Sequence, residues 1–437
     1  MDTNVTGAEP SLQDLLACRP QLSMHAMDGL CLEGVALNAV ADQYGTPCYV
    51  YGAGSIRTRF ASLRDAFRAE NLPIHIHYAV KANDHLAVLA LFREQGAGAD
   101  VVSIGEFLRA VKAGIQPEHI VYSGVGKAVY ELETALAAGV GQINVESAEE
   151  IEMISAIATR LGVSARIALR MNPDVDAGTH AKITTGRADN KFGIAASDVP
   201  ALYARAASLP GIKPMGIAMH IGSQILSTEP YRLAYSKGAD MVRALRAAGQ
   251  TVEVLDLGGG LGIGYQDEPA LSPSAFAAMV RQVCQGLDVR LMMEPGRYLI
   301  GPAGVLLASV ILNKQAGKRF VVLDAAMNDL IRPAMYDSWH GILPLAASAL
   351  YAPAQPADVV GPICESSDIF AKDRELPDLP TGARVAFLDA GAYGAAMGSS
   401  YNARPHPAIV LVDGGHAHLI TPRQTHEDLW RNEILPA

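Results

Sequence analysis

The sequence predicts an α/β fold, a TIM (β/α)8 barrel followed by a C-terminal all-β, Greek-key-like domain. Between about residue 74 and residue 300, short β-rich apolar runs alternate with helical stretches. A barrel has this repeat, and so does an open, doubly wound sheet. From about residue 301 the apolar runs are strand-like, and few helical stretches separate them. The length of 437 residues suits two domains, since a typical domain has ~150 residues and a single barrel ~250.

Eight short runs in the first region are predicted strands. They are residues 74–80, 99–102, 120–123, 142–146, 165–171, 214–221, 252–257 and 289–293. Ser103 with Glu106, and Ser147 with Glu150, mark two helix starts as capping boxes, in which both side chains bond free amides of the first turn. Three glycines mark helix ends, where a left-handed residue closes the helix: Gly96, Gly114 and Gly139. Eight such units are the number in a TIM barrel.

We expect three parts along the chain: residues 1–45, a segment that partly joins the β domain; residues 46–300, the barrel; and residues 301–437, the β domain. The strand-like runs of the last part are 305–312, 319–324, 358–363, 384–389 and 408–412. Residues 412–416 (VDGGH) predict a hairpin turn that leads into the run 417–420. Residues 47–51 (PCYVY) form another short strand, a candidate to join the β domain.

Composition excludes several classes of protein. Half of the residues are hydrophobic and 18% are charged, which fills a large core and excludes a disordered chain. The net charge of −10 argues against general affinity for nucleic acid or an anionic membrane. The N-terminal residues lack the basic-then-apolar order of a signal peptide. The five scattered cysteines, none in a CxxC pair, indicate a reducing cytoplasm without a disulfide framework or structural zinc.

Chemically distinctive residues follow four of the predicted strands. Lys81 follows the first strand, His220 closes the sixth, the run 258–260 (GGG) follows the seventh, and Glu294 follows the eighth. In a TIM barrel the carboxyl ends of the strands meet at one face, where reactive groups lie. Lys81 is either a lysine whose head reaches solvent from a strand end or an amine in an apolar pocket, able to form an imine with an aldehyde.

Glycine and arginine follow the seventh and eighth strands. Residues 257–264 (LGGGLGIG) form either a tight turn or a cradle whose amides bind phosphate. They do not match the dinucleotide-binding GxGxxG pattern, because no acidic residue ends the next strand. Residues 294–297 (EPGR) add an arginine whose fork suits phosphate or carboxylate.

His220 has two interpretations. It is either a core histidine bonded to backbone or a flat ring that stacks on a flat cofactor, with Ser223 offering a hydroxyl to phosphate. Zinc is a poor alternative, since the histidine pairs of the sequence lack a third ligand at a recognisable spacing. Together, a lysine, a phosphate cradle, a stacking ring and a buried carboxylate are the parts of a pyridoxal-phosphate site. In such a site Glu294 keeps the ring nitrogen protonated, which favours decarboxylation.

Seven motifs now mark a family resemblance. They are AVKAN (79–83), HIGSQ (220–224), LDLGGGLGIGY (255–265), EPGR (294–297), NDLIRPAMYDSWH (328–340), GPICESSD (361–368) and DAGAYGA (389–395). With them the chain resembles the pyridoxal-phosphate decarboxylases built on an alanine-racemase-like barrel, and within that group the branch that acts on diaminopimelate. The loop 172–193, with His180, also resembles that branch. One departure is Ala326, where the family usually has glycine, and we expect no functional consequence.

The resemblance implies a role for each site residue. The cofactor is pyridoxal 5'-phosphate, with Lys81 as its Schiff-base lysine, Asp100 close to that lysine, His220 on the ring and Glu294 at the ring nitrogen. The phosphate is held by Gly259, Gly260, Ser223, Gly296 and Tyr393, and Arg297 also lies at the cofactor. The substrate is held by Arg297, Arg332, Tyr336, Glu365 and Tyr393.

The resemblance also implies an assembly. Cys364 is the proton donor, and Cys364 and Glu365 come from the other subunit of a homodimer with shared active sites. The implied reaction converts meso-2,6-diaminopimelate to L-lysine and carbon dioxide, the last step of lysine biosynthesis, in the cytoplasm. For Cys364 alone, the alternative is a buried apolar residue.

Four rival functions remain open at this point. The nearest is a decarboxylase of the same fold that acts on ornithine, arginine or carboxynorspermidine, which lack a distal carboxylate. An amino-acid racemase typically places an arginine at the ring nitrogen, against which Glu294 argues. The joint presence of Lys81, His220, Glu294 and Cys364 argues against a non-catalytic regulator. A cofactor-free phosphosugar enzyme would use a glycine cradle but would not need Lys81 and Cys364 in these settings.

Overall fold

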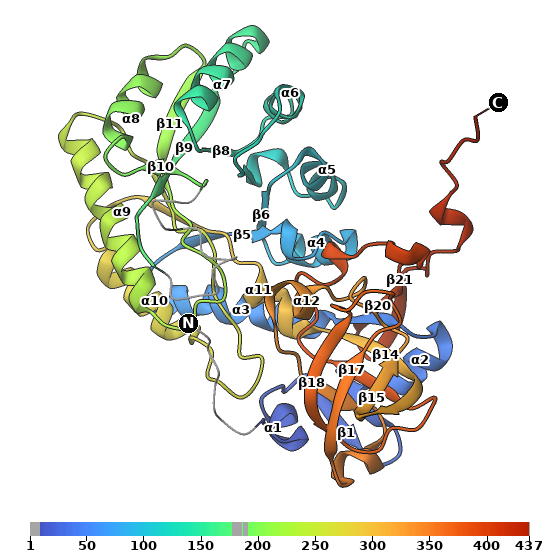
Figure 1. The fold of residues 1–437 in the computed structure, drawn as a ribbon. Coiled ribbons are helices and arrows are strands. Elements are labelled where there is room, and N and C mark those ends of the chain that lie inside the picture. Colours follow the sequence, from blue (N-terminus) through green and yellow to red (C-terminus); the bar gives the residue numbers. More distant parts are fainter. Residues whose placement is uncertain (1–8, 177–185, 187–190, 437) are drawn as a thin grey trace. The chain divides into compact units, whose positions relative to one another are not determined.

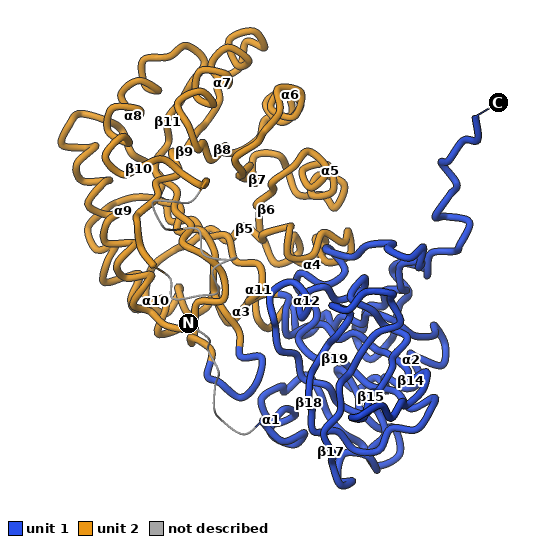
Figure 2. Tube along the Cα trace, viewed as in Figure 1, with its two compact units in different colours: residues 1–56, 264–269, 300–437 blue, residues 57–263, 270–299 orange. Residues whose placement is uncertain are grey.

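A computed structural model describes residues 9–176, 186 and 191–436 of the chain (Figure 1). The chain divides into two compact units (Figure 2). Unit 1 consists of Met1–Ile56, Gly264–Pro269 and Ile300–Ala437, and unit 2 of Arg57–Ile263 and Ala270–Leu299. The chain therefore begins in unit 1, forms unit 2, and returns to unit 1 at residue 300.

Unit 2 is a closed barrel of eight parallel strands. In sequence order they are β5 (Ile74–Ala79), β6 (Gly98–Val101), β7 (Ile120–Tyr122), β8 (Gln142–Val145), β9 (Ala165–Asn172), β11 (Ile212–Ala218), β12 (Val254–Asp256) and β13 (Arg290–Met293). Each strand pairs with the next, and β13 pairs with β5 to close the ring, while the short β10 (Ile194–Ala195) pairs with β9 outside it. Closure confirms the barrel and excludes the open sheet. The strands are apolar runs because both faces of a parallel sheet are covered.

Helices lie outside these strands (Figure 1). They are α3 (Ala53–Ala69), α4 (Leu86–Glu94), α5 (Ile104–Lys112), α6 (Val129–Ala137), α7 (Ala148–Leu161), α8 (Val199–Ser208), α9 (Glu229–Ala247) and α10 (Pro273–Val283), with a further short helix α11 (Arg297–Ile300). The predicted helix ends Gly96, Gly114 and Gly139 all have positive φ, as a left-handed closing residue requires. Within the described residues, no helix is long and apolar enough to cross a membrane.

The two predicted capping boxes form only in part. Ser103 and Ser147 do accept hydrogen bonds from the N–H groups of Glu106 and Glu150. The two carboxylates, however, accept from residues one position earlier than the boxes require: Glu106 from the Val102 N–H and Glu150 from the Glu146 N–H. Each glutamate therefore ties its helix to the end of the preceding strand instead of closing the box.

Six of the predicted strands are too long at their carboxyl ends, the run 214–221 by three residues and the other five by one. β11 ends at Ala218 and β12 at Asp256, so His220 lies two residues beyond its strand and does not close it. The Met219 N–H bonded to the Asp256 carbonyl is the last bond between β11 and β12, and beyond it both segments leave the sheet, with Gly258 at φ +64° after β12. His220 therefore belongs to a loop above the barrel.

Unit 1 is built on a large sheet. Its strands are β4 (Cys48–Gly52), β14 (Gly304–Ala316), β15 (Lys318–Leu323), β16 (Ile342–Pro344), β17 (Gln355–Val360), β18 (Ile369–Leu376), β19 (Arg384–Phe387), β20 (Ala408–Asp413) and β21 (His416–Thr421). Most pairs are antiparallel, but β15 with β17 and β20 with β4 are parallel. Gly414 and Gly415 both have positive φ between β20 and β21, as a two-residue hairpin turn requires.

Strand β4 shows where the domain boundary from the sequence fails. It pairs antiparallel with β14 and parallel with β20, so residues 46–56 belong with unit 1 and not with the barrel. Its side chains Cys48 and Val50 enter the unit 1 core together with Leu307 and Val410. The expectation that residues 47–51 join the β part is confirmed by this pairing.

Several elements of unit 1 were absent from the sequence prediction. They are α1 (Leu12–Ala17), β1 (Leu22–His25), β2 (Gly29–Leu32), β3 (Val35–Ala36), α2 (Leu37–Tyr44), α12 (Arg332–Tyr336), and the strands β16 and β18. β18 ends one edge of the main sheet, and its sequence IFAKDREL alternates charged and apolar residues weakly. An edge strand of this kind carries little hydrophobic signal, because much of it faces solvent.

Candidate active site

Lys81 lies just beyond β5, in a short helical turn (Val80–Ala82). Its Nζ is 3.2 Å from Oδ2 of Asp100 on β6, whose side chain is fully buried. Oδ1 of Asp100 has no hydrogen-bond partner among the described residues. A buried acceptor of this kind is costly unless a further donor reaches it. The barrel mouth thus presents a primary amine beside a carboxylate with unused bonding capacity, and Asp100 lies at Lys81 as expected.

His220 is held as a neutral ring. Its Nδ1 lies 3.2 Å from the backbone N–H of Gly259, which donates, so the ring proton is on Nε2. Burial, and then the nearby charges of Lys81 and Arg170, hold the pKa of His220 well below its usual range. A neutral, oriented imidazole can stack on a flat ring without adding positive charge to it.

The glycine run 258–260 lies in close contact with two other loops, those that follow β11 and β13. A Cβ on Gly258 would lie 2.1 Å from the Met219 carbonyl oxygen, and one on Gly259 would lie 2.2 Å from that of Glu294. Behind the turn, the Tyr235 hydroxyl donates to the Leu257 carbonyl at 3.0 Å. Backbone packing therefore requires these glycines, as the tight-turn interpretation proposed. The same packing holds the loop rigidly at the mouth.

Glu294 directly follows β13 and is buried. Asn144 donates to its Oε1 at 3.0 Å, and Glu294 also shares a side-chain hydrogen bond with Asp256. Burial raises the pKa of Glu294 well above its usual range, and the charges of Asp100 and Asp256 raise it further. Burial raises the pKa of Asp256 as well. Two carboxyl groups in contact cannot both ionise cheaply, so each carboxyl of the pair holds its proton more tightly than a free carboxyl does.

The polar network beneath Glu294 was missed from the sequence. Asn144 also donates to the Ser123 hydroxyl at 3.1 Å, and Gln142 donates to the Asn144 Oδ1 at 2.8 Å. The Gly258 N–H donates to Asp256 Oδ1 at 3.0 Å. A sequence signal did exist, because Gln142, Asn144 and Asp256 are polar residues inside predicted strands. Such residues need buried partners, and those partners lie on other strands.

Arg297 and Ser223 lie together at the same mouth. Arg297 begins α11 and is buried, and its Nη2 donates to the Ser223 hydroxyl at 3.2 Å. Gly296 precedes it and is also buried. The motifs HIGSQ and EPGR therefore meet in space. Together they place a cation and a hydroxyl beside the glycine turn.

The remaining predicted residues belong to unit 1. Arg332 and Tyr336 are the two ends of α12, with Arg332 buried and Tyr336 partly buried. Tyr393 lies in a loop at φ +56° and is partly buried. Cys364 and Glu365 are exposed, so the alternative of Cys364 as a buried apolar residue is wrong for this chain.

The loop that carries Cys364 is well anchored although its side chains are exposed. The Cys364 N–H donates to Asn402 at 2.9 Å. Buried Asp368 accepts from the N–H groups of Ile363 and Met327 at 2.7 and 2.6 Å. Backbone contacts therefore fix the loop, while Cys364 and Glu365 point to the surface of the unit.

Most of the loop 172–193 lies outside the described residues, including His180. Its two ends are held, with Glu146 accepting from the Gly193 N–H at 2.9 Å and from Arg170 at 2.8 Å. Asn172 Nδ2 donates to the Phe192 carbonyl at 3.2 Å. The loop therefore starts and ends beside the carboxyl ends of β8 and β9.

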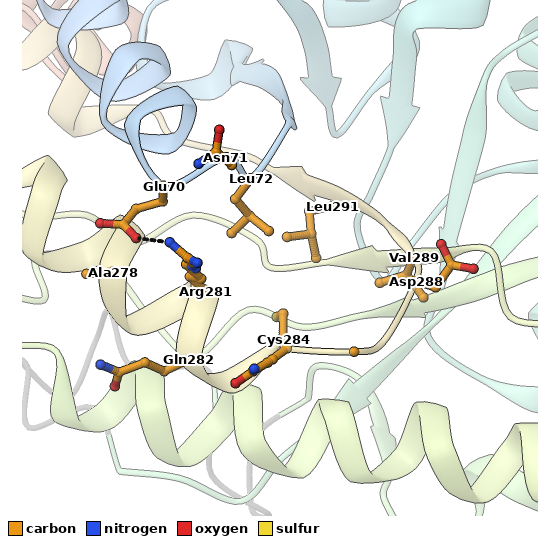
Figure 3. A pocket seen from close by; sticks show the side chains of 12 residues that line it. Glu70, Asn71, Leu72, Ala278, Arg281, Gln282, Cys284, Asp288, Val289 and Leu291 are labelled. Atoms are coloured by element: carbon orange, nitrogen blue, oxygen red, sulfur yellow. Dashed lines mark hydrogen bonds and ion pairs between the residues drawn. The ribbon is translucent and has the colours of Figure 1, made fainter.

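A hollow of about 570 Å³ lies at the other end of the barrel strands (Figure 3). Its lining includes Leu72 and Val289, which precede β5 and β13, and the Glu70–Arg281 ion pair. Burial raises the pKa of Cys284 in its wall to about 12, so the thiol is not a nucleophile at neutral pH. The hollow holds none of the predicted site residues, in keeping with the rule that barrel chemistry occurs at the carboxyl ends.

The donor set at the barrel mouth fits pyridoxal phosphate. It offers an amine for an aldehyde, an acceptor with unused capacity beside that amine, a neutral ring, and a carboxyl pair that can face a ring nitrogen. Fold and site together define a barrel enzyme of the pyridoxal-phosphate type.

Comparison with known proteins gives the same answer. Residues 53–301 match the family described as "Pyridoxal-dependent decarboxylase, pyridoxal binding domain". The chain is 49% identical to the diaminopimelate decarboxylase of Zymomonas mobilis, over 92% of this chain and 96% of that protein. It is 44% identical to that of Pseudomonas aeruginosa, over 93% and 97%. The chain belongs to the pyridoxal-dependent decarboxylases.

Solved structures agree. The diaminopimelate decarboxylase of Helicobacter pylori complexed with L-lysine matches with a TM-score of 0.88 at 40% identity, over 91% of this chain and 99% of that one. The enzyme of M. jannaschii, also in complex with L-lysine, matches with a TM-score of 0.90 at 32% identity, over 96% and 98%. The likeness covers both units.

Proposed function

We propose that this chain decarboxylates meso-2,6-diaminopimelate to L-lysine and carbon dioxide, the last step of lysine biosynthesis, with pyridoxal 5'-phosphate as cofactor. The observation that carries the proposal is the buried Glu294–Asp256 pair, which Asn144 contacts on both sides, at the barrel mouth that also holds Lys81 and His220. The identity of 41–49% to diaminopimelate decarboxylases over most of the chain supports the substrate.

The cofactor would be held by groups that the barrel already orients. Lys81 would bind the aldehyde carbon, His220 would stack on the ring, and Glu294 would face the ring nitrogen. Phosphate would be bound by a set that includes the glycine turn: Gly259, Gly260, Gly296, Ser223 and Tyr393. When bound, a pyridoxal ring with a protonated nitrogen withdraws electrons and stabilises the carbanion that loss of carbon dioxide leaves.

Glu294 decides the reaction class. Glu294, whose pKa is raised by burial and by its carboxyl neighbours, would face the ring nitrogen and share a proton with it, and the negative charge of the pair would stabilise the protonated nitrogen. An arginine at this position, as in the racemases, would leave the ring nitrogen unprotonated. Buried Glu294 and Asp256 therefore support decarboxylation over racemisation. Asp100 beside Lys81 would orient the amine.

The far end of the substrate explains the remaining residues. Diaminopimelate keeps a carboxylate and an ammonium at the end that does not react. Arg297 and Arg332 would receive the carboxylate, Glu365 the ammonium, and Tyr336 and Tyr393 would bound the site. Leaving one such group unpaired costs about 1–3 kcal/mol, which would reject ornithine, arginine and lysine.

Cys364 would donate the proton that replaces carbon dioxide. It is exposed on unit 1 of a single chain, which supports the proposal that it serves the active site of a second subunit. The proposed assembly is a homodimer with shared sites, working in the cytoplasm.

The deciding experiment measures carbon dioxide release by the purified protein loaded with pyridoxal phosphate. Meso-diaminopimelate, ornithine, arginine and lysine are compared side by side at equal concentrations. We expect carbon dioxide release from diaminopimelate to be at least 100-fold faster than release from ornithine, arginine or lysine. Faster release from ornithine or arginine would overturn the substrate, and release from none would overturn the reaction.

A further inference from the structure

Side chains of unit 1 hold the guanidinium of Arg332 by hydrogen bonds and a cation–π contact. The residue is 4% exposed. Its Nη1 lies 2.7 Å from Nε2 of His340, and its Nη2 donates to the Ser338 hydroxyl at 3.2 Å. The ring of Tyr265 lies under the cation, 4.7 Å from ring centroid to Cζ. With both terminal nitrogens held, the guanidinium plane cannot rotate.

The contact with His340 fixes the ring's tautomer. Nδ1 of His340 lies 2.7 Å from the carbonyl oxygen of Leu388. A carbonyl oxygen only accepts, so Nδ1 carries the proton and donates. Nε2 is then an acceptor, and it receives an N–H of Arg332. A protonated imidazole would instead oppose N–H to N–H, so this arrangement requires a neutral ring.

His340 is itself rigid. It is 1% exposed, its backbone carbonyl accepts from Arg374 at 2.8 Å, and the Tyr265 ring meets its ring edge-on at 5.2 Å. Rotation of the imidazole would break the Leu388 bond and the Arg332 bond together. Because the His340 ring cannot rotate, its hydrogen bond fixes the orientation of the Arg332 guanidinium.

The support continues to a second buried arginine. Asp389, directly after Leu388, pairs with Arg19 at 2.5 Å. Arg19 also donates to the backbone carbonyl of Tyr265 at 2.7 Å. The elements that hold Arg332 are thus tied to each other: one path runs through His340 to residues 388–389, and the other runs through Tyr265. Supporting contacts of this kind hold a binding side chain in the geometry that it needs.

We infer that His340 is a positioning residue of this enzyme, which as a neutral hydrogen-bond acceptor aims Arg332 at the distal carboxylate of the substrate. The inference rests on the proposed function of Arg332. It gives a role to the histidine of the motif NDLIRPAMYDSWH. His340 makes no contact with the reacting atoms in this proposal. Its effect is on substrate binding, so it acts on KM and not on kcat.

Two substitutions separate positioning from mere packing, because each preserves one of the two ring contacts. In His340→Asn the amide nitrogen takes the place of Nδ1, which keeps a donor for Leu388 and removes the acceptor for Arg332. In His340→Gln the longer side chain brings an amide oxygen to the place of Nε2, which keeps the acceptor and removes the Nδ1 donor. Both variants place a polar amide side chain, no longer than the histidine, in the same pocket. Urea unfolding of the two variants therefore shows whether a change in KM comes from lost stability.

The test uses the loaded dimer and initial rates of carbon dioxide release over a range of meso-diaminopimelate concentrations. We expect His340→Asn to raise KM about 10-fold with kcat within 3-fold of wild type, since one charge-assisted hydrogen bond and its orienting effect are lost. We expect His340→Gln to keep KM within 3-fold. Equal KM values for the two variants, or a loss that tracks urea stability, would overturn the positioning role.

A second measurement is independent of turnover. In protein labelled with ¹⁵N-histidine, the His340 signals, assigned by their loss in His340→Asn, should show a protonated Nδ1 and an unprotonated Nε2. Arg332→Met should shift the Nε2 signal. A protonated Nε2, or no shift on removal of the guanidinium, would overturn the inference even where wild-type activity is normal. Absence of activity with the expected ¹⁵N pattern would overturn the proposed function instead.

Discussion

The predicted site residues at the barrel mouth and those in the 361–368 loop of unit 1 differ in how far a single chain buries them. At the barrel mouth, Asp100, Asp256 and Glu294 are buried, and hydrogen bonds from Lys81, Gly258 and Asn144 reach them. In the 361–368 loop of unit 1, Cys364 and Glu365 are exposed although the backbone beneath them is fixed. A single chain buries the carboxylates at the barrel mouth, whereas it leaves Cys364 and Glu365 exposed.

This difference follows from what each set does in the proposed reaction. Groups that control charge on a cofactor act most strongly in a dry, preorganised setting. A proton donor that serves a neighbouring subunit must instead be presented at a surface. The contrast therefore separates residues whose substitution should disturb folding and cofactor binding from residues whose substitution should disturb turnover alone.

The largest effect is expected for Lys81→Ala. Without the amine, the cofactor has no covalent anchor and the substrate no exchange partner, so activity should fall by at least about 1,000-fold. Borohydride should fix the cofactor on Lys81 of the wild type, as read by peptide mapping. Modification at another lysine, or a colourless wild-type protein after incubation with cofactor, would contradict the assignment.

A smaller but selective loss is expected for Cys364→Ala. Turnover should fall about 100-fold or more, as for loss of a general acid, while cofactor affinity from absorbance titration stays within 2-fold. An equal loss of turnover and of cofactor affinity would contradict the prediction that the exposed residues affect turnover alone.

The same variant tests the shared sites. Each hybrid dimer of Lys81→Ala with Cys364→Ala has one site with both wild-type residues. After subunit exchange, the mixture of two inactive variants should recover about a quarter of wild-type activity, because half of the dimers are hybrids with one intact site. If confirmed hybrids remain inactive, Cys364 does not serve a neighbouring subunit.

Asp256→Asn should change the pH dependence of stability. The folded-state pKa values of Asp256 and Glu294 are raised, so their stabilisation is complete below about pH 4 and is lost as pH rises. For one retained proton the slope is about 1.4 kcal/mol per pH unit. Urea unfolding of the cofactor-free protein at pH 5 and pH 8 should show a flatter decline in the variant.

The exposed Asp240 on α9 provides the control for that experiment. It pairs with Arg243 at the surface, so Asp240→Asn should leave the slope as in wild type. A parallel decline in wild type and Asp256→Asn would show that the carboxyl pair does not retain a proton.

The smallest expected effect is on thiol labelling. Cys18 and Cys364 are exposed, whereas burial raises the pKa values of Cys48 and Cys284 to about 12. Iodoacetamide should label the exposed pair first. If Cys364 is covered in a dimer, its labelling should slow several-fold as protein concentration rises, while Cys18 stays constant. Labelling of Cys364 that is independent of concentration would count against burial of this residue by a partner.

Much of the barrel could be predicted because local patterns specify it. Apolar runs bounded by glycines gave all eight strands. Glu294 directly follows its strand, whereas Lys81 lies two residues beyond the end of β5 and not directly after it. The errors have local causes as well. β11 stops before His220 because its pairing with β12 ends at Ala218 and Asp256, and β18 was missed because an edge strand needs few apolar residues.

By itself, the sequence determined which reactive groups the protein carries and in which order the strands present them, because periodicity and turn residues act over short distances. Only the tertiary structure decided that Asp256 lies against Glu294, that His340 accepts from Arg332, and that Cys364 is exposed. These contacts depend on strand closure and on loops that meet from distant parts of the chain. Such meetings are set by the packing of whole units, which no short stretch of sequence encodes.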